Sequence, residues 1–190
     1  MRRALALAAA AAAAILTCQC GTAGADRAAS APSASAWRTV YAVLQHARCK
    51  NCHPAGRVPL QGDDSRVHGQ NVQGGPDGKG RFAMRCVNCH LEANAPGPNQ
   101  PPGAPNWHLP AAATPLVFEG RSPAELARQL ADPAHHGGRP MAQLLEHVST
   151  DPLVLWGWNP GEGRAPVPVP HAAFVAAMRT WIEGGCRVPD

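Results

Sequence analysis

The chain contains the pentapeptide Cys49-Lys50-Asn51-Cys52-His53 and a second copy of the same pattern, Cys86-Val87-Asn88-Cys89-His90. Cys-x-x-Cys-His is the sequence at which c-type haem is attached. The two thiols can add to the two vinyl groups on one porphyrin edge, and the histidine that follows can bring an imidazole nitrogen to the iron. Two copies predict two covalently bound haem c groups, held by Cys49, Cys52, Cys86 and Cys89, with His53 and His90 as the proximal iron ligands.

Other sites also use paired cysteines at this spacing. Two C-x-x-C pairs bind zinc in zinc ribbons, and such pairs occur in thioredoxin-like redox sites and in disulfide scaffolds. A zinc ribbon leaves His53 and His90 without a role, and thioredoxin-like chemistry expects a βαβ context that is absent here. The haem interpretation is favoured because it uses both cysteine pairs and both histidines.

The N-terminus predicts export from a bacterial cytoplasm. A short basic stretch precedes an apolar run from Ala4 to Leu16, which is shorter than the ~20 residues needed to span a bilayer but suits the core of a signal peptide. Cleavage after Ala25 gives a signal peptide of residues 1–25. The alternative is a lipoprotein signal that ends before Cys18, which would leave a lipid anchor there. Either route predicts the periplasm, where c-type haem is attached.

Downstream of the signal, a Ser/Ala-rich segment, 26–36, is expected to be a linker, and 37–190 to be one domain. Gly and Pro are abundant, with 19 and 20 residues, so the side chains alone should build a poor core and the haem-free chain should be poorly folded. Cys186, the only cysteine outside the motifs and the signal region, is expected to be a free thiol. The net charge of +4 comes without a dense Lys/Arg cluster, so no nucleic-acid partner is predicted.

Helices are predicted where apolar residues recur at helical spacing. The stretch from Trp37 to His46 has one apolar face and leads directly into the first haem motif. A second helix is expected to begin at the capping box Ser122-Pro123-Ala124-Glu125 and to end before Pro133. Two more helices are expected at 141–148 and 171–183, and two long loops at 54–80 and 94–114. The predicted fold class is mainly α with long irregular Pro/Gly-rich loops.

The sixth ligand of each haem iron largely sets its potential and its accessibility. His68, which stands upstream of Cys86 across a glycine-rich loop, and His108, which follows a tryptophan, are the favoured distal ligands. For each candidate, the alternative is a histidine hydrogen-bonded in a loop or to a haem propionate. The remaining distal candidates are His147, His171 and Met84. His135 and His136 lie in a Pro/Gly loop and are expected to face solvent.

Several further segments form a recognisable set: Arg48-Cys49-x-x-Cys52-His53-Pro54, Pro59-Leu60-Gln61-Gly62-Asp63, Ala83-Met84-Arg85-Cys86-x-x-Cys89-His90, Gly103-Ala104-Pro105-Asn106-Trp107-His108-Leu109 and Asp151-Pro152-Leu153-Val154-x-Trp156-Gly157-Trp158. With them, the chain resembles a family of small bacterial dihaem cytochromes c, often labelled isoquinoline 1-oxidoreductase subunit. The resemblance implies a single small dihaem cytochrome c domain and a molybdenum-hydroxylase partner. The chain has no molybdopterin or iron–sulfur motif, so such chemistry would belong to another polypeptide.

These observations predict an electron-transfer protein rather than an enzyme. It would carry electrons from a partner dehydrogenase of the molybdenum-hydroxylase type to a downstream cytochrome or oxidase. The alternative is a peroxidase-like haem enzyme with one open iron site, but such enzymes resemble two full cytochrome domains and this chain is short for that. A lipid-tethered redox sensor or docking module is a third possibility.

Overall fold

Helices predominate in the computed structural model, which describes residues 22–189 and contains 42% helix and 5% strand. This content is compatible with the expected mainly α class. Most of the expected signal peptide, including the alternative processing site at Cys18, falls on residues 1–21 and lies outside the described residues. No helix between residues 22 and 189 combines the length and the apolar character that a membrane span requires.

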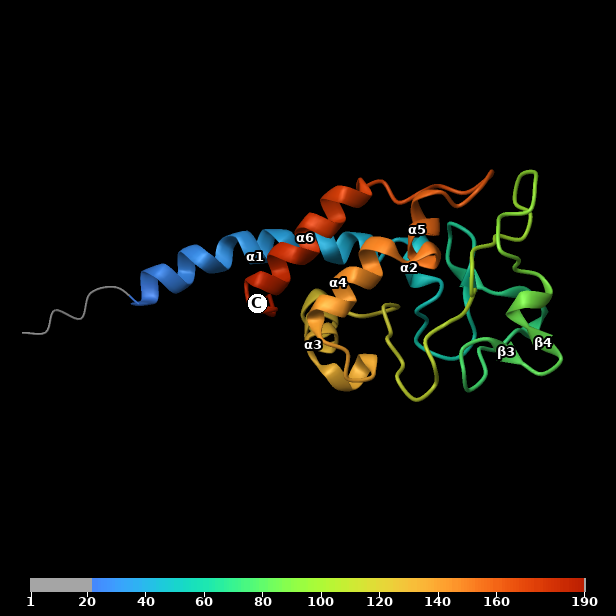
Figure 1. Ribbon diagram of the computed structural model, residues 1–190, viewed down its shortest axis with the longest axis horizontal. Coiled ribbons are helices and arrows are strands. Elements are labelled where there is room, and N and C mark those ends of the chain that lie inside the picture. The colour runs from blue at the N-terminus through green and yellow to red at the C-terminus, as the bar shows by residue number, and fades with distance from the viewer. Residues whose placement is uncertain (1–21, 190) are drawn as a thin grey trace, which may run out of the picture.

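The elements follow one another with long connections between them (Figure 1). The helices are α1 (Thr22–Leu44), α2 (Ala47–Lys50), α3 (Pro123–Ala131), α4 (Met141–Thr150), α5 (Pro152–Leu155) and α6 (His171–Glu183). Four short 3-10 turns are η1 (Gly69–Asn71), η2 (Cys86–Asn88), η3 (Pro133–His136) and η4 (Trp156–Trp158). Two small antiparallel hairpins pair β1 (Leu60–Gln61) with β2 (Arg66–Val67), and β3 (Gly80–Arg81) with β4 (Met84–Arg85).

The expected helices are present. At α3, the Ser122 side chain accepts from the Glu125 backbone N–H, and the Glu125 carboxylate accepts from the Ser122 N–H, so the capping box forms as predicted. This pair satisfies two backbone donors that a helix otherwise leaves free at its start. The helices expected at 141–148 and 171–183 are α4 and α6, and the two expected loops contain little besides the β1–β2 hairpin and η1.

The segment expected to be a linker, 26–36, is instead helical and belongs to α1. Its alanines have the highest helix propensity of all residues, and its end is fixed by packing because Ser33 is only 1% exposed. A Cβ placed on Gly184, at the end of α6, would lie 2.7 Å from the Ser33 hydroxyl oxygen. Glycine at 184 therefore lets α6 approach α1 closely enough to order this segment.

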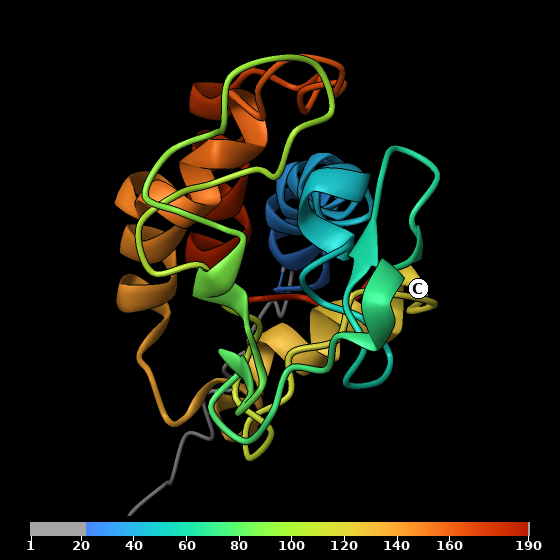
Figure 2. The same ribbon diagram turned by 90° about the vertical axis from the view of Figure 1, so that its right-hand side faces the viewer.

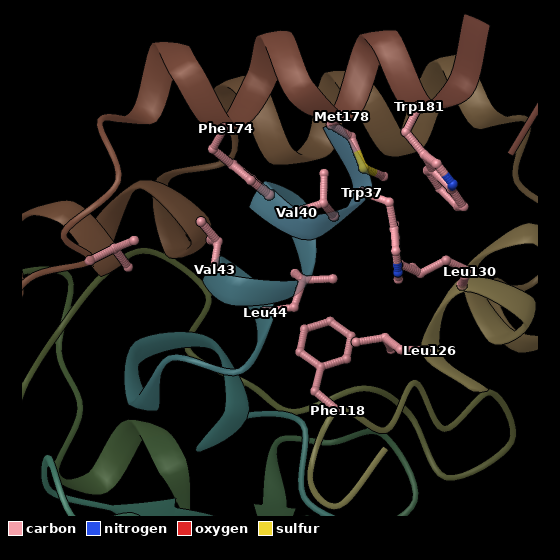
Figure 3. Packing of buried hydrophobic residues seen from close by; sticks show 12 residues of the cluster. Trp37, Val40, Val43, Leu44, Phe118, Leu126, Leu130, Phe174, Met178 and Trp181 are labelled. Carbon is pink, nitrogen blue, oxygen red and sulfur yellow. The ribbon is translucent and has the colours of Figure 1, made fainter. Parts of the chain in front are cut away.

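A hydrophobic core forms where α1 packs along α6 and α3 closes one side (Figure 3). The rings of Trp37 and Trp181 meet with centroids 4.6 Å apart, and the Trp37 indole N–H donates to the Pro123 carbonyl oxygen over 3.1 Å. The expectation that side chains alone build a poor core is therefore wrong for this part, because the apolar stripes of separate helices converge. The core residues are Trp37, Val40, Val43, Leu44, Phe118, Leu126, Ala127, Leu130, Val167, Phe174, Met178 and Trp181.

Residues 54–115, named here the loop region, lie beyond the C-terminal end of α1 (Figures 1 and 2). Few of their apolar side chains are buried, Leu109 being the largest, whereas large exposed ones concentrate there. The large apolar side chains that are exposed in the loop region are those of Val67, Phe82, Met84, Val87 and Leu91. The molecule therefore combines a helical half that packs on itself with a loop half that has little core of its own.

Candidate functional site

The first motif lies at the junction of the two halves. His46 follows α1 and caps the start of α2. Its Nδ1 accepts a hydrogen bond from the Arg48 backbone N–H. Cys49 is half-buried against the helical core. His53 follows, with its Nδ1 hydrogen-bonded to the Leu116 carbonyl oxygen over 2.7 Å. Since Nδ1 is engaged, Nε2 is the ring nitrogen left to bind a metal.

A stack and a short backbone bridge fix the orientation of His53. Its ring lies against Phe118 with centroids 3.8 Å apart and planes 12° from parallel. The backbone N–H of Phe118 donates to the His53 carbonyl oxygen over 2.9 Å, and the Gln45 amide donates to the Phe118 carbonyl oxygen over 2.8 Å. The segment before α3 thus holds the imidazole in one position.

Burial controls the protonation of the first motif. It raises the pKa of the Cys49 thiol to about 12 and that of Cys52 to about 11. It also lowers the pKa of His53 to about 4; the hydrogen bond to Leu116 opposes this shift, and His147 and His108 add to it. At neutral pH the imidazole is therefore neutral, the form that binds metals. Thiols with raised pKa values are poor nucleophiles, unlike those of thioredoxin-like pairs.

The second motif follows the β3–β4 hairpin and forms the 3-10 turn η2. Cys86 is buried, Cys89 is exposed, and the His90 Nδ1 is hydrogen-bonded to the Pro102 carbonyl oxygen over 2.8 Å. Trp107 stacks on the His90 ring, with centroids 4.7 Å apart and planes 1° from parallel. Burial lowers the pKa of His90, so this imidazole is also favoured in its neutral form.

His68, at the end of the β1–β2 hairpin, faces His90. The two ring centroids are 6.1 Å apart and the planes cross at 65°. The His68 Nδ1 is hydrogen-bonded to the Gly69 carbonyl oxygen over 2.8 Å, so Nε2 is free on both rings. An iron placed ~2 Å from one nitrogen of each imidazole separates the two ring centroids by ~6 Å. The observed spacing fits one metal ion held between His68 and His90.

A cavity of about 690 Å³ lies at this pair of histidines. Its volume is within the range of cofactor sites, about 300–1,000 Å³. It brings together sulfur-bearing and imidazole side chains from segments that are distant in sequence, namely Cys52, His68, Met84, Cys86, Cys89 and His90, beside Trp107 and Trp156. The donor set and the volume fit a haem attached to the second motif, and Met84 lies at the cavity wall as an alternative to His68.

The other expected distal ligands lie elsewhere. His108 and His147 are close enough to His53 to affect its pKa, and each has its Nδ1 engaged, by the Asn106 carbonyl oxygen and, at 3.1 Å, by an Asp151 carboxylate oxygen. The Nε2 atom of each is left without a recorded hydrogen bond among the described residues. His171, by contrast, has its Nε2 hydrogen-bonded to the Val148 carbonyl oxygen over 2.9 Å and packs against Trp158.

Two buried polar residues were not singled out by the sequence. His136, expected in solvent, is 7% exposed, and neither ring nitrogen has a hydrogen-bond partner. Asp132 caps η3, with its side chain accepting from the Ala134 N–H, and this turns the Pro/Gly loop inward. Arg48 is also buried, at the wall of the cavity. Composition gives no signal for either, because both lie in polar surroundings in the sequence.

The cysteines of the two motifs are free thiols in this structure. Within the part of the chain that the structure describes, no three His, Cys, Asp or Glu side chains converge on a common point as ligands of one metal ion. The four motif cysteines thus do not form the tetrahedral set of a zinc ribbon. Comparisons with family models, with curated proteins and with solved structures found no match to this chain.

Proposed function

We propose that this chain is a dihaem c-type cytochrome of the bacterial periplasm, built as a single small domain over residues 37–190, and that it transfers electrons without making or breaking substrate bonds. A haem bound at each Cys-x-x-Cys-His motif would supply a one-electron iron couple. The observation that carries the proposal is the opposed pair His68 and His90, with free Nε2 atoms and a centroid spacing of 6.1 Å, beside the cysteines of the second motif.

The residues of this chain have three tasks in such a protein. Cys49, Cys52, Cys86 and Cys89 tether the two cofactors, so that neither is lost during repeated oxidation and reduction. Carbonyl oxygens at Leu116 and Pro102 hold the proximal imidazoles by their Nδ1 atoms, which fixes their orientation and tautomer. Trp107 and Trp156 form part of the cavity wall and meet edge to face, with ring centroids 4.9 Å apart. This wall keeps water away from the cofactor, which lowers the reorganisation energy and favours fast electron transfer.

The two sites would lie close together. Cys52 of the first motif lines the same cavity as Cys86 and Cys89 of the second, and Cys86 is near enough to Cys52 to raise its pKa, after the larger effect of burial. Haems attached to sulfurs that line one cavity would be held close enough for a two-step electron relay. His108 or His147 would complete the coordination at the first motif, opposite His53.

The partners of this relay are proposed on the resemblance and not on the geometry. The donor would be a periplasmic dehydrogenase of the molybdenum-hydroxylase type, and the acceptor a second cytochrome or an oxidase. Purification of the chain from its native host under gentle conditions should recover the donor with it. Recovery of the chain with no oxidoreductase would count against this part of the proposal.

The optical and electron paramagnetic resonance spectra of the oxidised protein test the function. Two low-spin haems per chain, with no binding of carbon monoxide after reduction, are expected if both irons carry two axial protein ligands. The alternative, a peroxidase-like enzyme with one open iron, predicts one high-spin haem per chain and reaction with peroxide. That second result would replace electron transfer with catalysis as the function.

A further inference from the structure

Arg48 carries a buried donor that the protein does not satisfy. Its side chain is 2% exposed and one end, Nη2, pairs with the Asp63 carboxylate. The Nε atom is also buried but has no hydrogen-bond partner, although Arg48 lines the cavity described above. Buried N–H groups in native proteins nearly always have an acceptor, so an unpartnered one at a cavity wall indicates a ligand atom that accepts from it.

The surroundings of Arg48 favour a negatively charged acceptor. Arg164 lines the same cavity, and the charge of Arg48 is close enough to lower the pKa of Arg164, after the larger effect of burial. Asp63 is the carboxylate between them, and it also accepts from the Ala165 backbone N–H over 3.2 Å, with its side chain 51% exposed. Asp64, Arg66 and Arg85 line the cavity as well, so its charged lining is four arginines against two aspartates, a net positive charge.

The position of Arg48 is fixed. It belongs to α2, directly before Cys49, and its guanidinium carbon lies 5.7 Å from the centre of the Trp156 ring. Stacking on an aromatic face orients the plane of the guanidinium and so the direction of the Nε–H bond. Asn51, three residues further on and thus on the same side of the turn, presents a second unpartnered buried atom, its carbonyl oxygen Oδ1.

We propose that this wall is a carboxylate-binding subsite, in which the Arg48 Nε–H donates to an ionised propionate of the haem held in the cavity and Arg164 adds positive charge. The inference rests on the proposed dihaem function and assigns a role that the two motifs do not include. A water molecule on Asn51 Oδ1 would donate to that oxygen and complete the polar network. The charged and titratable groups near Arg48 are Asp63, Arg164, Cys49, Cys52 and His46, and Asp64, Arg66 and Arg85 line the same cavity.

The subsite would set the potential of one haem. A ferric haem carries one more positive charge than a ferrous haem, so a nearby negative carboxylate favours the ferric form, and a cation that neutralises it favours the ferrous form. At an effective dielectric constant of about 20, two unit charges ~10 Å apart interact by roughly the energy of a tenfold change in equilibrium constant. For a one-electron couple that change corresponds to about 59 mV.

Redox titration of three holoprotein variants tests the inference. Arg48→Gln should lower the midpoint potential of one haem by about 59 mV, a tenfold change in equilibrium constant, and Asp63→Asn should raise the potential of the same haem. Arg121→Gln is the matched control, because Arg121 is paired with Glu125 at 3.9 Å, its side chain is 43% exposed, and it is not among the residues that line the cavity. Solvent screening should keep its shift well below that of Arg48→Gln.

The outcomes separate this inference from the function on which it rests. If the unmodified chain has two haems and low-spin spectra, but neither Arg48→Gln nor Asp63→Asn moves a potential, the subsite is wrong and the cytochrome stands. Equal shifts in Arg48→Gln and Arg121→Gln would also overturn it, since they indicate an unspecific charge effect. If Arg48→Gln does not take up haem, Asp63→Asn decides, and an unchanged potential there rejects the subsite. A chain without haem rejects both.

Discussion

Replacing His68 with alanine should open one of two haem irons and leave the other unchanged. In the structure the His68 and His90 rings are 6.1 Å apart, the spacing at which one iron reaches a nitrogen of each ring at ~2 Å. An alanine ends at Cβ and provides no donor atom there. The iron bound by His90 then keeps one imidazole, and its sixth position passes to water or stays open.

The size of the effect follows from the stoichiometry. Only one of the two irons loses a ligand. Half of the haem in the ferric protein should therefore change from low spin to high spin. After reduction, the His68→Ala variant should bind about one carbon monoxide per chain, because a five-coordinate ferrous haem accepts it. The unmodified protein should bind none. Optical titration and electron paramagnetic resonance measure both quantities on the same sample.

Two further variants make the test strict. Met84 lines the same cavity and its thioether could replace the imidazole, so the experiment is repeated in a Met84→Ala background. His135→Ala is the matched control, because this histidine is 44% exposed and pairs only with Asp132, at 3.7 Å. Two low-spin haems in His68→Ala,Met84→Ala, or the same spectral change in His135→Ala, would refute the assignment of His68.

Three further results are expected. Among His108→Ala and His147→Ala, one variant should convert the other haem to high spin, since both residues lie near His53; two unchanged spectra would contradict the proposed coordination of the first iron. Trp181→Ala should cost ~3–5 kcal/mol of unfolding free energy in denaturant titrations, because it empties the centre of the core, whereas the surface change Val188→Ala should cost less than ~0.5 kcal/mol. With all four motif cysteines changed to serine, hydrogen exchange should remain slow in α1 and α6 and become fast throughout the loop region; uniform fast exchange would show that the helical core needs haem.

The helical half of the fold is largely predictable from local sequence. The capping box at Ser122 and the apolar stripe of α6 specify their helices through backbone hydrogen bonds and periodicity, which are short-range properties. The start of α1 could not be predicted in this way, because the composition of 26–36 is that of a linker. The C-terminal end of this segment is ordered by the burial of Ser33 against Gly184, a contact between residues far apart in the chain.

The hairpins could not be anticipated from pattern. Each strand has two residues, too few to show the alternation by which strands are recognised. Their positions nevertheless matter, because the β1–β2 hairpin brings His68 to His90. The sequence indicates His68 as a candidate ligand. Only the pairing of Leu60 with Val67 shows how the chain folds back to bring His68 to the second motif.

The candidate site, like the fold, could be predicted from the sequence only in part. The motif residues are evident from sequence, because thioether attachment demands a fixed spacing. The sixth ligands are not, because a histidine in a loop can be brought to either iron. His108 illustrates this: it follows the second motif in sequence but lies near His53 of the first, while its neighbour Trp107 stacks on His90. The burial of Arg48 and His136 likewise depends on tertiary contacts.

The intact mass of the chain purified from its native host, with a pyridine haemochrome spectrum of the same sample, decides whether the cysteines of the two motifs hold haem. The expected mass is that of the processed polypeptide plus two haems, with the spectrum of porphyrins joined through two thioether bonds each. A mass equal to the polypeptide alone, or zinc in place of iron in the metal analysis, would contradict the dihaem cytochrome.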